Sequence, residues 1–171
     1  MAISCQLASG ITKDLSCGYV LQSVKLIYLA NTADVESDAN GEVTLKAEGK
    51  WHLFEPAKNT ASFTDVLNTT DSGNKYRTHT LSFSVAGSYT DEVQSIMDTL
   101  SLGSFLGIAV FSDNTGVLLG TKNSGLEATV VTNTGAASAT EASGISVEMS
   151  SDLTSSAYHI EDVKTFIGEN A

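Results

Sequence analysis

The sequence predicts a mainly β fold, a β-sandwich or open barrel of two packed sheets with one flanking α-helix. Short runs of β-branched and aromatic residues recur along the chain, and turn-forming residues separate them. Only residues 88–103 have the apolar periodicity of a helix. The 171 residues, 42% of them hydrophobic, suffice for one core. We therefore expect a single domain over 1–171, with an N-terminal arm at 1–22 and a C-terminal tail at 158–171.

The predicted helix has one apolar side. Its apolar residues recur at i, i+3, i+4 and i+7, which places them on one face of an α-helix. Ser88 and Thr90 are both suitable N-caps, and Gly103 supplies a left-handed stop at the C-terminus. A helix of about three turns cannot bury such a stripe alone, so we expect it to pack internally against a sheet. The packing residues are Val93, Ile96, Met97 and Leu100.

The N-terminal strands follow the arm. Residues 24–30 are rich in β-formers, and residues 42–48 alternate apolar with polar side chains. Asn40 and Gly41 between them suit a turn that needs positive φ. We expect these two strands to form a hairpin, followed by a short strand at 51–55.

A second hairpin is predicted further along. Its arms are residues 61–67 and the chain from Tyr76 onward, and the polar stretch from Asn68 to Asn74 forms its exposed tip. Residues 78–85 then alternate strictly, which predicts a half-buried strand. Its core face carries His79, Leu81, Phe83 and Val85, and its other face carries Thr78, Thr80, Ser82 and Ser84.

The C-terminal half contains a central strand and a long loop. Residues 105–111 are apolar on both faces, so we expect a strand buried from both sides. Residues 117–120 return from it, and 126–131 form the next strand. From Thr132 to Gly144 the residues are small and include no core former, which predicts a long exposed loop. The last alternating strand covers 145–150.

Charge and residue content exclude several classes of function. Nine Lys plus Arg against twenty Asp plus Glu give a net charge of −11, which repels phosphate backbones and disfavours a sequence-reading nucleic-acid binder. A conduit through which nucleic acid slides remains compatible with this charge. Cys5 and Cys17 form no CxxC motif, and His52, His79 and His159 belong to no catalytic pattern. We expect no enzyme, no metal, no cofactor and no membrane insertion.

Six segments in order resemble tail tube (major tail) proteins of tailed bacteriophages, especially those that infect Bacteroidetes. They are GITKDL, VKLIYLAN, FEPAKNTASFTDVLN, THTLSFSV, FLGIAVFSDNTGVLLG and GISVEMSSDLTSSAYHI, and the similarity covers about residues 3–160. The resemblance implies hexameric rings that stack into a tube for DNA delivery in the virion tail, assembled in the bacterial host cytoplasm. It also implies contacts with other tail proteins, namely a sheath or terminator, a tape measure and a baseplate.

This interpretation assigns residues to two surfaces besides the helix packing. Contacts between stacked rings would use the arm from Ile3 to Leu21, the tip from Asn68 to Asn74 and the loop from Thr132 to Gly144. The lumen would be lined by polar strand faces that do not need to be covered by a core. The predicted lumen residues are Thr78, Thr80, Ser82, Ser84, Glu127, Thr129, Ser146 and Glu148.

A second interpretation is a head decoration protein, an adaptor, or a receptor-binding or carbohydrate-binding β-sandwich. Aromatic residues make up 7% of the chain and include one Trp. Carbohydrate-binding surfaces commonly use exposed aromatic rings, so this content favours the tail tube over the alternative.

Overall fold

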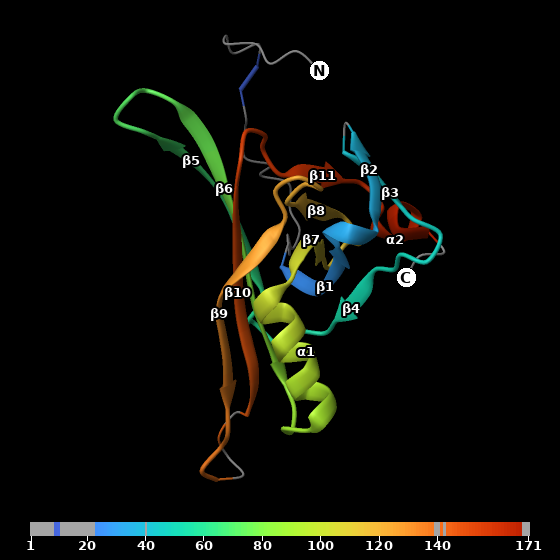
Figure 1. The fold of residues 1–171 in the computed structure, drawn as a ribbon, viewed down its shortest axis with the longest axis vertical. Helices are drawn as coiled ribbons and strands as arrows, with labels where there is room; N and C mark the ends of the chain where they lie inside the picture. Colours follow the sequence, from blue (N-terminus) through green and yellow to red (C-terminus); the bar gives the residue numbers. More distant parts are fainter. Residues whose placement is uncertain (1–8, 11–22, 40, 139–140, 142, 169–171) are drawn as a thin grey trace, which may run out of the picture.

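The structure is a computed structural model that describes residues 9–10, 23–39, 41–138, 141 and 143–168. The predicted ring contacts at Ile3 and Leu21 lie outside these residues. The predicted fold class is confirmed: the chain is mainly β, with two packed layers of antiparallel strands and a flanking helix (Figure 1).

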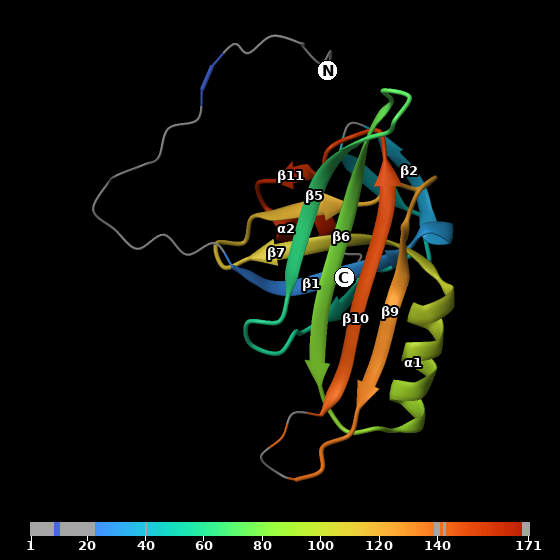
Figure 2. The ribbon, with the colours of Figure 1, turned by 90° about the vertical axis from the view of Figure 1, so that its left-hand side faces the viewer.

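The strands of the two layers run across one another (Figure 2). The two layers are continuous, because Ser104 and Phe105 of the second pair with Glu127 and Leu126 of the first. In order, the first layer consists of β5 (Ser62–Thr69), β6 (Lys75–Ala86), β10 (Gly144–Leu153) and β9 (Leu126–Thr134). The second consists of β4 (His52–Phe54), β1 (Val24–Asn31), β7 (Ser104–Phe111), β8 (Gly116–Leu119) and β11 (Tyr158–Ile160).

Two apolar cores lie on either side of the second layer. The first core fills the space between the layers and includes Leu81, Phe83 and Met149. The second includes Ile108 and Trp51 and is completed by a two-stranded sheet, which follows the 3-10 turn Thr32–Asp34, and by a short helix. The sheet is β2 (Val35–Ala39) with β3 (Glu42–Leu45), and the helix is α2 (Val163–Ile167). Strand β7 is therefore buried on both faces, as its apolar sequence predicts.

The predicted hairpin of residues 24–30 with 42–48 is wrong. Strand β1 pairs with β4 and β7, whereas β3 pairs with β2. The reason is that β1 places Ile27 and Leu29 in the first core and Ala30 in the second, so it needs a central position. The predicted turn residue is correct, because Gly41 has a φ of 81°.

Helix α1 (Asp91–Leu102) is shorter than the predicted 88–103. Thr90 is the N-cap, and its hydroxyl accepts a hydrogen bond from the Val93 N–H at 3.3 Å. The predicted left-handed stop is wrong: Gly103 has a φ of −87°. A Cβ there would lie 2.4 Å from the ring of Phe105, so the glycine permits a close approach instead of a special backbone angle.

The apolar stripe of α1 is buried unevenly. Leu100 is buried, Val93 and Met97 are half-buried, and Ile96 is 38% exposed. Helix α1 packs along β9, the outermost strand of the first layer, so it lies at the margin of the core. The prediction that Ile96 is an internal packing residue is therefore corrected, and Leu100 is the anchor.

Substitution of the anchor should cost far more than substitution of its neighbour. Leu100→Ala is expected to lower the free energy of unfolding by about 2–5 kcal/mol, because it leaves a cavity in the core. Ile96→Ala should lower it by about 1 kcal/mol or less, since that side chain is already partly in water. Urea unfolding measures both values, and equal losses would contradict this placement of α1.

The loop predicted from Thr132 to Gly144 is shorter in the structure. Strand β9 continues to Thr134, and Gly144 of β10 pairs with it. Threonine is favourable in strands even where it contributes nothing to a core, so hydrogen bonding with β10 extends β9. The predicted tail contains β11 and α2, and the Asp162 side chain caps α2 by accepting from the N–H groups of Lys164 and Thr165.

Candidate functional site

The outward face of the first layer brings all eight predicted lumen residues together. Because one face of this sheet covers the first core, alternate residues point away from it. Register places Ser84 opposite Ser146 and Ser82 opposite Glu148, and Thr129 reaches Glu148 from a bulged part of β9. We name the outward side of these four strands the hydroxyl face. Its Ser and Thr residues are Ser62, Thr64, Thr78, Thr80, Ser82, Ser84, Thr129, Thr132, Thr134, Ser146 and Ser150.

Side-chain hydrogen bonds link neighbouring strands across the hydroxyl face. In these bonds the polar side chains of the face act as donors and acceptors for one another. The bonds also keep the hydroxyl groups aligned across the strands. The closest pairs are Ser62 Oγ with Ser82 Oγ at 2.9 Å and Ser84 Oγ with Ser146 Oγ at 2.8 Å. The Thr78 hydroxyl donates to Asp152 at 2.6 Å and accepts from Asn68 Nδ2 at 2.8 Å.

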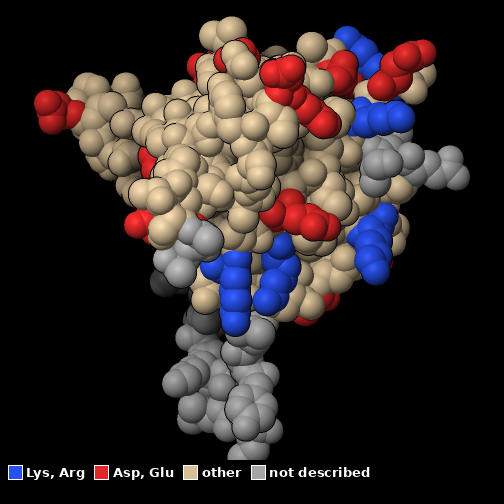
Figure 3. Space-filling view, turned by 90° about the horizontal axis from the view of Figure 1, so that it is seen from below, with Lys and Arg blue, Asp and Glu red and all other residues tan. Residues whose placement is uncertain are grey.

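Charge on the hydroxyl face is of one sign. The outward positions of its described strands include Glu127, Glu148 and Asp152 and no Lys or Arg. Figure 3 looks at the molecule from below, with the hydroxyl face on its left, and its Lys and Arg side chains gather on the right and lower parts. The hydroxyl face therefore repels a polyanion weakly and offers it no cationic contact.

Both sides of the first layer end in open strand edges. Strand β5 is the last strand on one side, and β9 pairs with β7 only at its first two residues. We name residues 62–69 the β5 edge and residues 128–134 the β9 edge. Each edge carries exposed apolar side chains: Val66 is 49% and Leu67 53% exposed on β5, and Val130 is 51% exposed on β9. Open edges with apolar side chains favour pairing with another strand.

The sequence patterns did not predict a role for these exposed apolar residues at the strand edges. The outward residues of β5 are Ser62, Thr64, Val66 and Asn68. Val66 is apolar, whereas the other three are polar. That departure from alternation was visible in the sequence. Which strands lie at the edges was not, because it depends on long-range pairing.

The predicted ring contacts are partly described. The tip residues Thr70 to Asn74 are exposed and form a tight turn in which the Thr70 N–H donates to Asn74 O at 2.8 Å. Asn68 belongs to β5 and is half-buried. Thr132 and Gly144 belong to strands, and Thr132 lies on the hydroxyl face.

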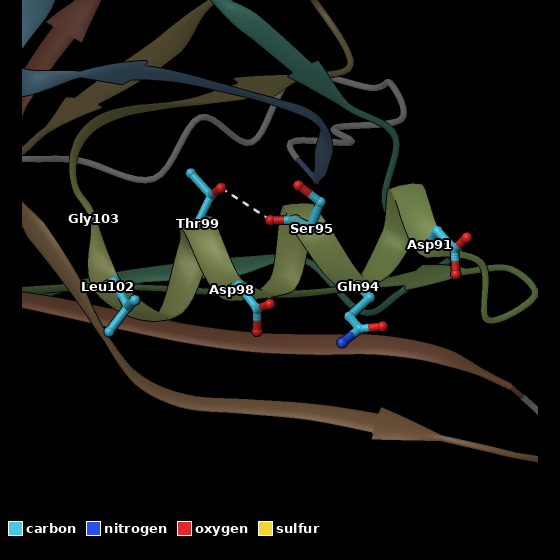
Figure 4. A pocket seen from close by; sticks show the side chains of 7 residues that line it. All are labelled: Asp91, Gln94, Ser95, Asp98, Thr99, Leu102 and Gly103. Carbon is cyan, nitrogen blue, oxygen red and sulfur yellow. Dashed lines mark hydrogen bonds between the residues drawn. The ribbon is translucent and has the colours of Figure 1, made fainter.

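Helix α1 exposes a polar side that is distinct from its packing stripe. Figure 4 shows Gln94, Asp98 and Leu102 projecting from it, while Thr99 donates to the Ser95 carbonyl at 2.9 Å. Leu102 is 89% exposed. The first turn of α1 is acidic, and its last turn has no basic residue.

An apolar groove of about 620 Å³ lies on the other side of α1, between the helix and β1 and β4. Trp51, Phe54 and Ile96 line it. No group of three or more metal-ligating side chains occurs in the described part of the chain.

His79 is the one buried histidine among the described residues, and it belongs to a polar cluster inside the first layer. Its Nδ1 accepts from the Gly120 N–H at 3.3 Å, so Nε2 carries the proton and donates to Ser155 O at 3.1 Å. Burial lowers the pKa of His79, and this outweighs the opposing effect of Asp65. The cluster links β6 to two loops.

Asp65 lies beside His79 on β5. Partial burial alone would raise its pKa, but hydrogen bonds from the Ala157 N–H and from Arg77 lower the pKa overall. The Arg77 to Asp65 ion pair measures 3.0 Å. These contacts give the cluster a structural role.

Comparison with known proteins identifies no relative of this chain. None of the described helices is long and apolar enough to cross a membrane. No protein family, no curated protein and no solved structure matches the chain.

Proposed function

We propose that the chain is a structural subunit that joins copies of itself through its open strand edges into closed rings. The rings stack into a tube with the hydroxyl face inward, and the tube is the tail tube through which a tailed bacteriophage delivers DNA. The observation that carries the proposal is a four-stranded layer open at both sides, with an uncharged to acidic outward face.

The strand directions support closure by rotation. Each neighbouring pair in the first layer is antiparallel, so with four strands β9 runs opposite to β5. A copy related by rotation about an axis along the tube presents its β5 antiparallel to the β9 of its neighbour. The antiparallel ladder therefore continues across each junction, and closing the ring removes both open edges of the first layer.

The stagger of the two edges also supports a barrel. Register through Ser82 and Glu148 places Ser62 level with Val130, and from there the β5 edge and the β9 edge extend in opposite directions (Figure 2). The edges are thus offset by about four residues across four strands, which corresponds to a strand tilt of about 35°. Closed barrels have tilts of roughly 35–45°.

The size of such a ring suits duplex DNA. Six copies, the number that the resemblance implies, give a barrel of about 24 strands with a circumference of at least about 115 Å. With the strands tilted by about 35° the circumference rises to about 140 Å. Side chains take up about 5 Å on each side, so the bore measures about 35 Å. Hydroxyl and carboxylate side chains around it would let the polyanion pass without binding.

Negative-stain electron microscopy of the concentrated protein tests the proposal, and native mass spectrometry counts the copies. Stacked rings or tubes are expected. Discrete monomers or trimers would reject the tube and favour the decoration, adaptor or receptor-binding alternative.

Deletion of the arm provides a second test. A chain lacking residues 1–21 is expected to fold, since residues 24–167 already supply two apolar cores, but to fail to form stacked tubes. Circular dichroism reports folding and microscopy reports tubes. Normal tubes from the truncated chain would show that the arm is not needed for contacts between stacked rings. The exposed tip at residues 70–74 would then be the main ring contact.

A further inference from the structure

We infer that the β9 edge of one copy pairs with the β5 edge of the next in one defined register, with Val66 opposite Val130, and that α1 covers Leu67 of the incoming strand. This inference rests on the proposed function and specifies the surface through which two copies meet.

Full overlap of the two edges sets the register. When residues 62–69 lie antiparallel to 128–134, Val66 falls opposite Val130 and Thr64 falls opposite Thr132. All four of these side chains point outward within their own subunit. A slip of one residue would set outward side chains opposite inward ones, so the alternation of both strands excludes it.

The exposed apolar residues agree with this register. Val66 and Val130 are each about half exposed on an otherwise polar face, one at either side of the layer. In the junction they become direct cross-strand neighbours, and β-branched pairs are favourable there. Both valines then lose contact with water, which explains apolar side chains at two outward positions of a hydroxyl-rich surface.

Helix α1 provides the cover for Leu67. An α-helix with its side chains is about 10–12 Å wide, whereas strands are spaced by about 4.8 Å. Because α1 packs along the outermost strand β9, it overhangs the place that the next strand would occupy (Figure 2). Leu67 points to the inward side of β5, 53% exposed, and would enter that place beneath α1. Met97 of α1 is a half-buried apolar side chain suited to receive it.

Charge complementarity also favours a second copy as the occupant. Asp91, Glu92 and Asp98 lie on α1, which contains no Lys or Arg. Lys75 and Arg77 stand next to the turn of the β5–β6 hairpin, on the same inward side as Leu67. Arg77 is already paired with Asp65, so Lys75 is the cation that the hairpin would bring to the C-terminal end of α1, where a positive charge is favourable.

Cysteine cross-linking tests the register. In a background with Cys5→Ser and Cys17→Ser, the pair Val66→Cys and Val130→Cys is compared with the pair Val66→Cys and Thr134→Cys. All these strand positions point outward, and Thr134 lies about 13 Å from Val130 along β9. Directly opposite residues in antiparallel strands have Cα separations of about 4.5–5.5 Å, which suit a disulfide. Oxidised glutathione is the oxidant, and non-reducing electrophoresis separates the products.

The matched pair is expected to give a ladder of oligomers that ends at the ring size, about tenfold more abundant than in the offset pair. Rings in microscopy together with equal ladders, or with no ladder, would overturn the inferred register. Absence of rings from the wild-type chain would overturn the proposed function itself. Circular dichroism of each variant shows that the subunits are folded, so a missing ladder cannot come from unfolding.

Discussion

The double variant Val66→Lys, Val130→Lys is expected to fold normally and to form no rings at concentrations where the wild-type chain assembles. Both side chains are about half exposed in the subunit, so their replacement leaves both cores intact. In the junction the two ammonium groups would lie directly opposite one another, which is destabilising. Lysine on an edge strand is also a common way in which proteins prevent strand pairing.

The effect on ring assembly should be large because every junction of a ring contains the repulsive lysine pair. At about 1 kcal/mol per junction, the concentration required for assembly should rise by about tenfold. Analytical ultracentrifugation measures this concentration, and urea unfolding checks that the subunit is unchanged. The matched control, Val66→Lys with Val130→Glu, replaces the repulsion by an opposite-charge pair and should recover rings. Rings from the double-lysine variant would show that these valines do not meet.

The strands were predictable wherever one face is buried and the other is not. Strand β6 illustrates this: Leu81 and Phe83 alternate with Thr80 and Ser82, and a period of two with one apolar face has a single interpretation. Strand β7 was equally clear, because a short run that is apolar throughout requires cover on both sides. The composition of the hydroxyl face followed from the same alternation.

Pairing between distant strands was not predictable in the same way. Strand β2 lies within an acidic segment and contains one buried residue, Val35, so nothing in its local pattern separates it from a turn. Its partner β3 was instead assigned to β1, the preceding run with strong β propensity. Burial of β1 in both cores makes β7 its neighbour. Because β1 is then already paired, β3 pairs with β2 instead.

The ends of the helices were also not fully predictable from the sequence. Gly103 fits the sequence rule for a left-handed stop, but its role comes from the ring of Phe105 two residues later, which occupies the space of a side chain. Helix α2 has five residues and depends on the Asp162 cap and on burial of Val163 and Ile167. A helix this short has no periodicity that a sequence pattern can reveal.

Acid is expected to destabilise the subunit in two steps, and the first depends on His79. The pKa of His79 in the folded chain lies below its ordinary value of 6.5, mainly because the ring is buried. The unfolded chain therefore binds this proton first as the pH falls. The contribution of neutral His79 to stability is fully present above pH 6.5 and is lost as the pH falls through 6.5 toward the lower folded pKa.

Asp65 contributes to the second step in more acidic solution, together with Asp113 and Asp162, whose pKa values are lowered by hydrogen bonds from Thr115 and Thr165. The pKa of Asp65 lies below the ordinary value of 3.8, since the Ala157 N–H and Arg77 stabilise the carboxylate despite partial burial. Its contribution is present above pH 3.8 and is lost as the pH falls below that value. The two steps are separate because one begins near neutrality and the other needs strong acid.

Urea unfolding at a series of pH values separates the two groups. His79→Gln should remove the first step and leave the second, because glutamine does not titrate. It should also cost about 1–3 kcal/mol at pH 8, since the Gly120 N–H loses its acceptor in a buried site. His52→Gln, on the exposed side of β4, is the matched control and should keep the wild-type profile. A wild-type free energy of unfolding that stays constant from pH 8 to pH 5 would contradict a buried neutral His79 and the cluster that holds β6 to its two loops.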